Sequence, residues 1–335
     1  MALRRIVLSR TDSIGDVILT LPMAGALRQR YPDLYIIFLG ATYTRPIVEC
    51  CPYVNEFADW SIISKKTDTE KINTFKKFQA DAIIHVFPQR EIARLAKKAE
   101  IPVRVGTSHR AFHGRYCNRR VNFSRKNSDL HEAQLNFQLF RPFRMPILNA
   151  DLQEVRKCLS LIPPKLELEA LHLLHPDKFN LIIHPKSKGS AREWGIDNFG
   201  KLIDLLPAEK FRIFLCGTAS EEALIGDLLS KVNDNVVNLC GKLSLSEYIT
   251  FIAAADGLIA ASTGPLHIAA AVGSHAIGLY PPIHPMHAGR WGALGDHVKI
   301  FTQEKECDDC RHTTDCACMR AIRPEMVRDY LITLL

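Results

Sequence analysis

The sequence predicts an α/β protein of two domains, each built around a mostly parallel sheet. Three observations support this prediction. Apolar runs of strand length alternate with helical stretches in both halves of the chain, which is typical of βαβ units. Residues 163–179 separate the two sets and lack a strand pattern, so we expect a linker there. The length of 335 residues and the hydrophobic content of 47% are enough to fill two cores.

The first alternating set lies in residues 1–162, the predicted N-terminal domain. It opens with a strand at 4–9, and the apolar positions after the tight turn at Gly15 have helical spacing. Further strands are expected at 35–39, 81–87 and 102–106. Further helices are expected near 44–51, 67–79, 90–99 and 130–140.

The second set lies in residues 180–319, the predicted C-terminal domain. Its clearest unit is 257–273, where an apolar strand run, a break at 262–265 and a run of small residues end at Gly273, a typical helix stop. The other strands are expected at 180–184, 211–216, 235–239 and 275–280. The helices are expected at 197–206, 220–231, 245–255 and 264–272, and a last amphipathic helix at 324–335.

Charge is distributed unevenly along the chain. The first 150 residues carry a net charge of +11 and the remainder −4, within a total of +7. This asymmetry predicts that the first half meets something anionic: a nucleic acid, a phospholipid surface or an acidic glycolipid. A solvated basic surface without a partner is the alternative. The densest basic patch is expected in loops and contains Arg104, Arg110, Arg115, Arg119, Arg120 and Arg125.

Neither a membrane span nor a signal peptide is expected. The most apolar region, 257–283, is interrupted by prolines and histidines, and the apolar run near the N-terminus is too short for a leader. We therefore expect a cytoplasmic protein whose ten cysteines are mostly reduced. Four of them lie within twelve residues, Cys307, Cys310, Cys316 and Cys318, and could bind zinc. The second pair is closely spaced for such a site, so reduced thiols are the favoured alternative.

Two carboxylates follow the first strand. Asp16 stands where a helix begins, and Asp12 lies in the same loop. A carboxylate at this position caps the helix dipole, which is the structural interpretation of Asp16. The functional interpretation is a general base, because open α/β sheets bind ligands at the loops after their strands. Asp12 is a competing candidate for that base.

The break at 262–265 suits a phosphate. Thr263 is a plausible N-cap, Gly264 permits close approach of a ligand, and a helix N-terminus offers unpaired N–H groups and a positive dipole end. His267, one turn into the helix, could reach the same anion. An ordinary β-turn-α unit without a ligand is the alternative.

Two further strand ends in the second half carry candidate ligand contacts. The loop 184–194 is rich in Ser, Gly, Lys and Arg, which suits phosphate contact, although a solvated loop is the alternative. Glu221 and Glu222 follow the strand at 211–216, where a carboxylate could meet a ribose hydroxyl.

These motifs together resemble glycosyltransferase family 9, the heptosyltransferases of lipopolysaccharide core synthesis. The resemblance rests on Arg10-Thr-Asp-Ser-Ile-Gly-Asp-Val with Leu21-Pro22, on Ser262-Thr-Gly-Pro-Leu-His-Ile-Ala-Ala-Ala, and on the cysteine-rich stretch before Arg323-Pro-Glu-Met-Val. It implies a GT-B fold: two Rossmann-like domains with parallel sheets facing a central cleft. The last segment, 320–335, is then expected to pack back on the first domain.

The resemblance also implies an activity. Heptose would move from ADP-heptose, with inversion, to the inner core of lipopolysaccharide, either Kdo-lipid A or heptosylated core. No metal or other cofactor is implied. The protein would contact the cytoplasmic face of the inner membrane peripherally, and no nucleic acid partner is expected.

Residue roles follow from the same resemblance. Asp16 corresponds to the catalytic base. The implied donor-binding residues are Ser187, Lys188, Arg192, Glu221, Glu222, Ser262, Thr263, Gly264 and His267. The expected acceptor-binding residues are Arg10, Asp12, Arg115, Arg119 and Arg120. Two positions depart from the family pattern: Ser262 stands where many members have Asp, and Lys186 where Gly is common.

Two other functions remain open from the sequence. One is a GT-B glycosyltransferase that uses another nucleotide sugar, such as a UDP-sugar. The other is a non-catalytic anion-binding protein, against which the presence of Asp16 together with the Thr263 turn argues, because a binder needs no base.

Overall fold

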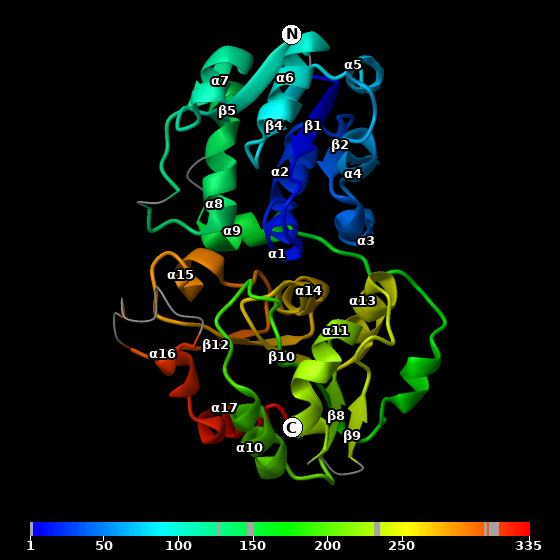
Figure 1. Ribbon diagram of the computed structural model, residues 1–335, viewed down its shortest axis with the longest axis vertical. Coiled ribbons are helices and arrows are strands. Elements are labelled where there is room, and N and C mark those ends of the chain that lie inside the picture. The colour runs from blue at the N-terminus through cyan, green and yellow to red at the C-terminus, as the bar shows by residue number, and fades with distance from the viewer. Residues whose placement is uncertain (1–2, 126–127, 146–150, 231–234, 305–306, 308–314) are drawn as a thin grey trace. The chain divides into compact units, whose positions relative to one another are not determined.

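The computed structural model describes residues 3–125, 128–145, 151–230, 235–304, 307 and 315–335. The chain divides into two compact units, Met1–Ile162 and Pro163–Leu335 (Figure 1). Each unit contains a six-stranded sheet in which every pairing is parallel. The predicted α/β class with parallel sheets is confirmed.

The first unit has the strand order β3-β2-β1-β4-β5-β6. Its strands are β1 (Arg5–Ser9), β2 (Tyr35–Gly40), β3 (Glu56–Asp59), β4 (Ala82–His85), β5 (Val103–Thr107) and β6 (Arg119–Val121). Its α-helices are α1 (Ile14–Ile18), α2 (Pro22–Arg30), α3 (Arg45–Glu49), α4 (Trp60–Ile63), α5 (Asp68–Lys77), α6 (Arg90–Lys98), α7 (Ala111–Tyr116), α8 (Glu132–Phe137) and α9 (Leu152–Lys157). Two 3₁₀-helices, η1 (Thr42–Thr44) and η2 (Gln138–Phe143), follow β2 and α8.

The strand order of this sheet determines where a ligand can bind. The chain runs outward from β1 to β3 on one side and from β4 to β6 on the other, so the direction reverses between β1 and β4. Loops at the carboxyl ends of these two central strands diverge and leave room for a ligand. The loop after β1 contains both candidate carboxylates, so the fold places them at this point.

The predicted central strands were found, and two edge strands were missed. β3 and β6 are short, and β6 contains Arg119 and Arg120, whose side chains are exposed. Charged side chains are typical of edge strands, because only one side of the strand is paired. The prediction that the arginine patch lies in loops is therefore wrong for four of its members: Arg104 belongs to β5, Arg115 to α7, and Arg119 and Arg120 to β6, whereas Arg110 and Arg125 do lie in loops.

The second unit has the strand order β12-β11-β10-β7-β8-β9, with its reversal between β10 and β7. Its strands are β7 (Phe179–His184), β8 (Phe211–Leu215), β9 (Val236–Asn238), β10 (Gly257–Ala261), β11 (His275–Leu279) and β12 (Val298–Phe301). Its α-helices are α10 (Ile196–Leu205), α11 (Ala219–Glu222), α12 (Gly226–Leu229), α13 (Leu245–Ala254), α14 (Gly264–Val272), α15 (Ala288–Trp291), α16 (Ala317–Arg320) and α17 (Pro324–Ile332). Two 3₁₀-helices are η4 (Glu169–Leu173) and η5 (Ala223–Ile225).

The last helix, α17, belongs to the second unit. It packs against α10, and Val327 and Leu331 are fully buried in the same core as Trp194 and Phe199. One face of the amphipathic helix thus completes the apolar core of the second unit. The expectation that segment 320–335 also packs back on the first domain stays a prediction.

In the parts of the chain that the structure describes, no helix has both the length and the apolar character needed to cross a membrane.

Candidate functional site

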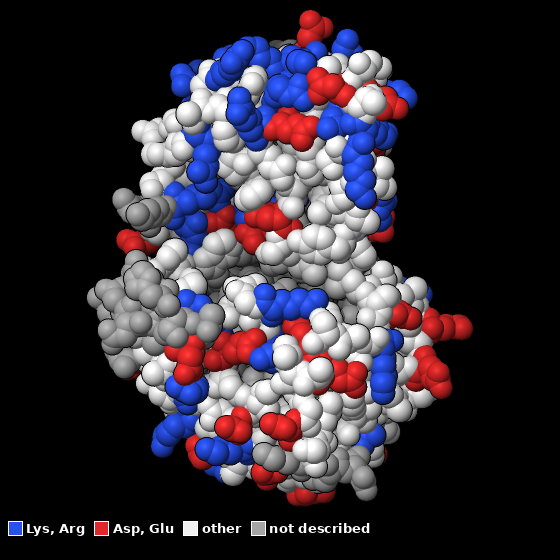
Figure 2. Space-filling view, viewed as in Figure 1, with Lys and Arg blue, Asp and Glu red and all other residues white. Residues whose placement is uncertain are grey.

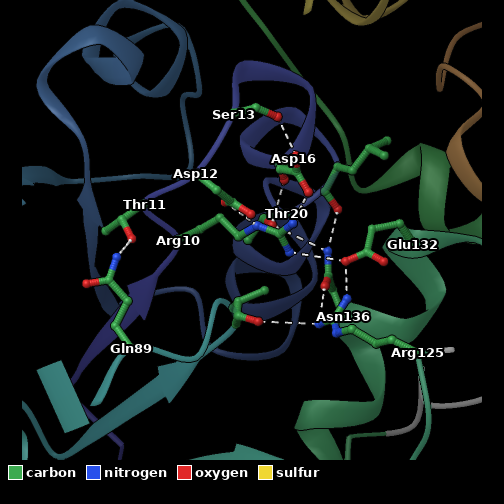
Figure 3. A network of polar contacts seen from close by, with 12 residues as sticks. Arg10, Thr11, Asp12, Ser13, Asp16, Thr20, Gln89, Arg125, Glu132 and Asn136 are labelled. Carbon is green, nitrogen blue, oxygen red and sulfur yellow. Dashed lines mark hydrogen bonds and ion pairs between the residues drawn. The ribbon is translucent and has the colours of Figure 1, made fainter. Parts of the chain in front are cut away.

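A network of charged side chains surrounds Arg10, the first residue after β1 (Figure 3). Arg10 is 3% exposed. Its Nε donates to Asp12 Oδ1 at 2.7 Å, its Nη1 donates to Glu132 Oε1 at 3.1 Å, and its Nη2 donates to Asp16 Oδ1. Burial lowers the pKa of Arg10, but the nearby carboxylates of Asp16, Asp12 and Glu132 outweigh it and raise that pKa. Arg10 thus carries a permanent positive charge and has little surface to offer an acceptor, contrary to the expected role.

Asp16 lies in the first turn of α1, with 19% of its side chain exposed. Arg10 donates to one carboxylate oxygen and the Ser13 hydroxyl donates to the other. Its backbone carbonyl accepts a hydrogen bond from Thr20 Oγ1 at 2.9 Å. Asp16 is therefore held in one orientation while part of its carboxylate still faces solvent, which suits a general base.

Asp12, the other carboxylate of this segment, has a shifted pKa. Burial raises the pKa of Asp12 to about 6, and the negative charge of Asp16 adds to the rise although Arg10 opposes it. Its backbone carbonyl accepts a hydrogen bond from the Tyr43 hydroxyl at 2.6 Å. Burial, with smaller contributions from Asp12 and Asp16, also raises the pKa of Tyr43. Asp12 therefore lies in an environment that favours its protonated form.

Three residues belong to the network although the sequence did not predict that they contact the first loop. Glu132 and Asn136 come from α8, and Arg125 precedes it. Arg125 pairs with Glu132 Oε1, and its Nη2 donates to Asn136 Oδ1 at 2.9 Å. The sequence contains no local signal for these contacts, because α8 lies more than 110 residues beyond the loop that it contacts.

In the second unit, the turn after β10 has the predicted form. Thr263 occupies the N-cap position of α14, Gly264 and Pro265 open the helix, and Gly273 ends it with a φ of 93°. The Thr263 hydroxyl donates to the Ala261 carbonyl at 3.3 Å and does not cap the helix. Backbone N–H groups at this helix start remain suited to an anion. Ser262 is half-buried, and His267 is 3% exposed within α14.

The loop after β7 lies next to this turn, because β7 and β10 are paired neighbours at the reversal of the sheet. Ser187 is 5% exposed, and both its backbone N–H and its hydroxyl donate to Glu193 Oε1 at 3.0 Å. Ser187 thus closes the loop internally. Lys188 is exposed and has a positive φ of 49°, and Arg192 is half-buried.

A pocket of about 400 Å³ opens beside this loop, in the second unit. Ser187, Arg192 and Glu193 line one part, and Asp315 and Arg320 line another. Asp315 and Arg320 form an ion pair at 2.9 Å. Arg192 therefore borders a cavity that charged side chains of both signs line.

The end of β8 distinguishes the two adjacent glutamates. Glu221 is 4% exposed, and its carboxylate accepts hydrogen bonds from the backbone N–H and the hydroxyl of Thr218. It therefore serves as the capping residue of α11. Glu222 is half-buried and accepts a 2.6 Å hydrogen bond from Asn238.

The basic patch separates into internal and external arginines. Arg104 donates to the carbonyls of Ile101 and Tyr116, and Arg125 is bound to Glu132, so both stabilise the first unit. Arg115, Arg119 and Arg120 are exposed. On the face shown in Figure 2, Lys and Arg side chains gather over the part of the first unit where Figure 1 labels α5, α6 and α7.

The cysteine-rich segment gives no support for zinc. Cys310 lies outside the described residues, and Cys307, Cys316 and Cys318 are buried in the core of the second unit. Throughout the described residues, no group of three or more His, Cys, Asp or Glu side chains could hold a metal ion.

Comparisons with known proteins agree with this geometry. The model of glycosyltransferase family 9 (heptosyltransferase) matches residues 72–319. A Haemophilus influenzae protein with the provisional name of a glycosyltransferase is 28% identical, over 88% of this chain and 87% of its own. Lipopolysaccharide heptosyltransferase 3 of Escherichia coli K12 is 26% identical, over 79% of each chain. The structure of E. coli ADP-heptose lps heptosyltransferase II is similar with a TM-score of 0.76 at 19% identity, covering 99% of this chain and 98% of that one. The chain therefore belongs to glycosyltransferase family 9, the heptosyltransferases, and is a glycosyltransferase of the GT-B fold.

Proposed function

We propose that this glycosyltransferase moves a heptose from ADP-heptose to the inner core of lipopolysaccharide, with Asp16 as the general base. The observation that supports this most is the partly exposed carboxylate of Asp16, held by Arg10 and Ser13 at the ligand-binding edge of the first sheet. The donor is inferred from the relatives, among them an E. coli protein described as an ADP-heptose enzyme.

The chemistry is an inverting transfer. Asp16 removes the proton of an acceptor hydroxyl as that oxygen attacks the anomeric carbon, and the bond from this carbon to the diphosphate breaks. Negative charge grows on the leaving nucleoside diphosphate. The N-terminus of α14 at Thr263 and Gly264, together with Arg192, supplies the positive potential that stabilises this charge.

Other donor contacts are assigned by accessibility. Glu222 is the better candidate for a ribose hydroxyl, because the carboxylate of Glu221 is buried and caps α11. Lys188 is exposed and Ser262 is half-buried, and both remain candidates for donor contact. His267 is buried and remains a candidate only through the resemblance. Ser187 contributes by closing its loop through Glu193.

The acceptor side is assigned to the first unit. Asp12 flanks the base, and the exposed Arg115, Arg119 and Arg120 carry charge of the sign needed for an acidic core sugar or a lipid phosphate. We propose that this basic surface also provides peripheral contact with the cytoplasmic face of the inner membrane.

A donor screen tests the proposal directly. ADP-heptose, UDP-sugars and GDP-sugars are offered with a core-lipid acceptor, and nucleotide release and product are measured. Turnover with ADP-heptose alone is expected. Preferred turnover with a UDP-sugar would instead identify the other GT-B activity.

Replacing the base tests the mechanism. Asp16→Asn should leave donor affinity nearly unchanged and lower turnover by about a hundredfold or more, the usual scale for a lost general base. Transfer kinetics and donor titration of wild type and variant measure both quantities. Near-normal turnover would show that Asp16 has a structural role, and Asp12 would then be the candidate for the general base.

A further inference from the structure

The proposed chemistry does not use one buried carboxylate of the first unit. Glu132, the first residue of α8, is 1% exposed. Its Oε1 accepts a hydrogen bond from Arg10 Nη1 at 3.1 Å and pairs with Arg125 Nη1. A buried carboxylate destabilises the folded state unless it is paired with opposite charge. The carboxylate of Glu132 therefore depends on the two guanidinium groups that it contacts.

The three carboxylates around Arg10 fix its orientation. A guanidinium group is planar and carries its donors in a rigid fork. Nε is bound to Asp12, Nη2 to Asp16 and Nη1 to Glu132, so each edge of the fork has an anionic acceptor (Figure 3). Only Glu132 comes from outside the loop after β1, so it is the contact that ties the fork to another element.

We propose that Glu132 is a positioning residue for transfer: by holding Arg10 Nη1, it fixes the guanidinium that orients the carboxylate of Asp16. This inference rests on the proposed function, because it takes Asp16 as the base. Glu132 itself is buried, so it would act through Arg10 and not by contacting donor or acceptor.

A second connection from α8 reaches the backbone of the same turn. The side-chain amide of Asn136 donates to the Leu19 carbonyl at 3.0 Å and to Thr20 Oγ1 at 3.3 Å. Thr20 Oγ1 in turn donates to the backbone carbonyl of Asp16 at 2.9 Å. The helix α8 is thus connected to Asp16 twice, through Arg10 to its side chain and through Thr20 to its backbone.

The charges facing this network predict a measurable electrostatic effect. Arg10 and Arg125 are opposed by Asp12, Asp16 and Glu132, with the Tyr43 hydroxyl at the edge. Removing the negative charge of Glu132 leaves two carboxylates, instead of three, beside the positive charge of Arg10. The pKa of Asp12, which burial raises to about 6, should then fall.

The test compares Glu132→Gln with the matched control Glu91→Gln. Glu91, whose side chain is 39% exposed, forms an ion pair with Lys71 at 2.6 Å in the same unit. Glu132→Gln should lower turnover by about tenfold or more, the scale expected for a misplaced catalytic group, and leave the acceptor KM and the donor Kd within about twofold. Glu91→Gln should match wild type in all three.

A readout independent of transfer accompanies the kinetics. The side-chain carboxyl of Asp12 is titrated by NMR in wild type and both variants, and only Glu132→Gln should move its inflection to lower pH. Unchanged turnover together with an unchanged inflection would overturn the proposal. So would a loss of turnover that matches a loss of folded protein.

Glu132→Asp covers the case in which the Gln variant does not fold. It keeps the charge and shortens the reach to Arg10, so turnover should fall while the Asp12 inflection stays near its wild-type pH. Wild-type turnover in this variant would contradict the positioning role. Asp16→Asn is measured in parallel: if it retains turnover, the base assignment fails, whereas the titration of Asp12 still reports on the link through Glu132.

Discussion

At the scale of single residues, the first unit concentrates charge around one buried guanidinium. Arg10 balances three carboxylates, of which Asp16 is partly exposed and Glu132 is buried. This arrangement gives neighbouring carboxylates different properties, so the residue type alone does not determine the role. Asp12 shows this most clearly, because burial raises its pKa to about 6 while it still contacts Arg10.

The raised pKa of Asp12 predicts a pH dependence of stability. Its pKa is about 6 in the folded protein and 3.8 is its ordinary value, so between these values the folded state binds more protons than the unfolded state. The contribution of Asp12 to the free energy of unfolding must therefore decrease as the pH rises from about 4 to about 6. Asp12→Asn removes this contribution, so the variant should gain stability relative to wild type over that window.

Urea unfolding of both proteins at pH 4.5 and pH 7 measures this difference. The comparison between the two proteins cancels the titration of groups that do not interact with Asp12. A stability difference that is the same at both pH values would contradict the prediction.

Arg192 is the residue-scale test of the donor side. Arg192→Ala should weaken binding of the intact donor and of the free nucleoside diphosphate, because a charged hydrogen bond contributes roughly 1.5–3 kcal/mol. Binding of the nucleoside, which lacks phosphates, should not change. Isothermal titration calorimetry with the three ligands measures this, and equal losses for nucleoside and diphosphate would refute the assignment.

At the scale of secondary structure, local sequence determines where elements begin, and packing determines where they lie. The helix α14 begins and ends where its Thr263-Gly264-Pro265 and Gly273 signals predict. The last helix also has the predicted amphipathic pattern, yet the pattern does not identify the core that it joins. Its buried residues Val327 and Leu331 complete the core of the second unit.

The position of α17 predicts its energetic contribution. Leu331 is fully buried, so Leu331→Ala should lower the free energy of unfolding by about 2–5 kcal/mol. Ile332, the adjacent residue, is 39% exposed, and Ile332→Ala should change stability by about 0.5 kcal/mol or less. Denaturant unfolding of the two variants provides the comparison, and similar losses in both would show that α17 is not packed as described.

At the scale of the whole molecule, the charge asymmetry of the sequence becomes a difference between two units. The first 150 residues carry +11 and the remainder −4, and the four exposed arginines of the patch, Arg110, Arg115, Arg119 and Arg120, belong to the first unit. Two of the six patch arginines, Arg104 and Arg125, are bound internally. A net charge counted from sequence therefore overstates the basic surface that is available to a partner.

The external arginines predict salt-dependent attachment. Replacing Arg115, Arg119 and Arg120 with Ser should raise the apparent acceptor KM and reduce binding to anionic vesicles, with donor binding unchanged. Added salt should weaken wild-type vesicle binding, because exposed charges are screened over about 8–10 Å at physiological ionic strength. The matched control replaces three exposed lysines in or just before α5, Lys66, Lys76 and Lys77, with Ser.

Vesicle co-sedimentation and acceptor kinetics, both at low and high salt, measure the effects of the two triple variants. Equal effects of the two triple variants would indicate dependence on net charge alone. Wild-type vesicle binding and acceptor KM in a folded arginine variant would show that this surface is not the acceptor side.

The amino-acid sequence alone predicts the alternation of strands and helices, the division near residue 163, the strand-turn-helix at 257–273 and the position of Asp16 after the first strand. These features follow from hydrophobic periodicity and turn chemistry, which operate between residues close in the chain. The folded chain is needed to identify the side chains around Asp16, the edge strands of each sheet and the core to which α17 belongs. Glu132 and Asn136 contact the first loop because chain segments far apart in sequence pack together. Neither hydrophobic periodicity nor a local sequence motif predicts a contact of this kind.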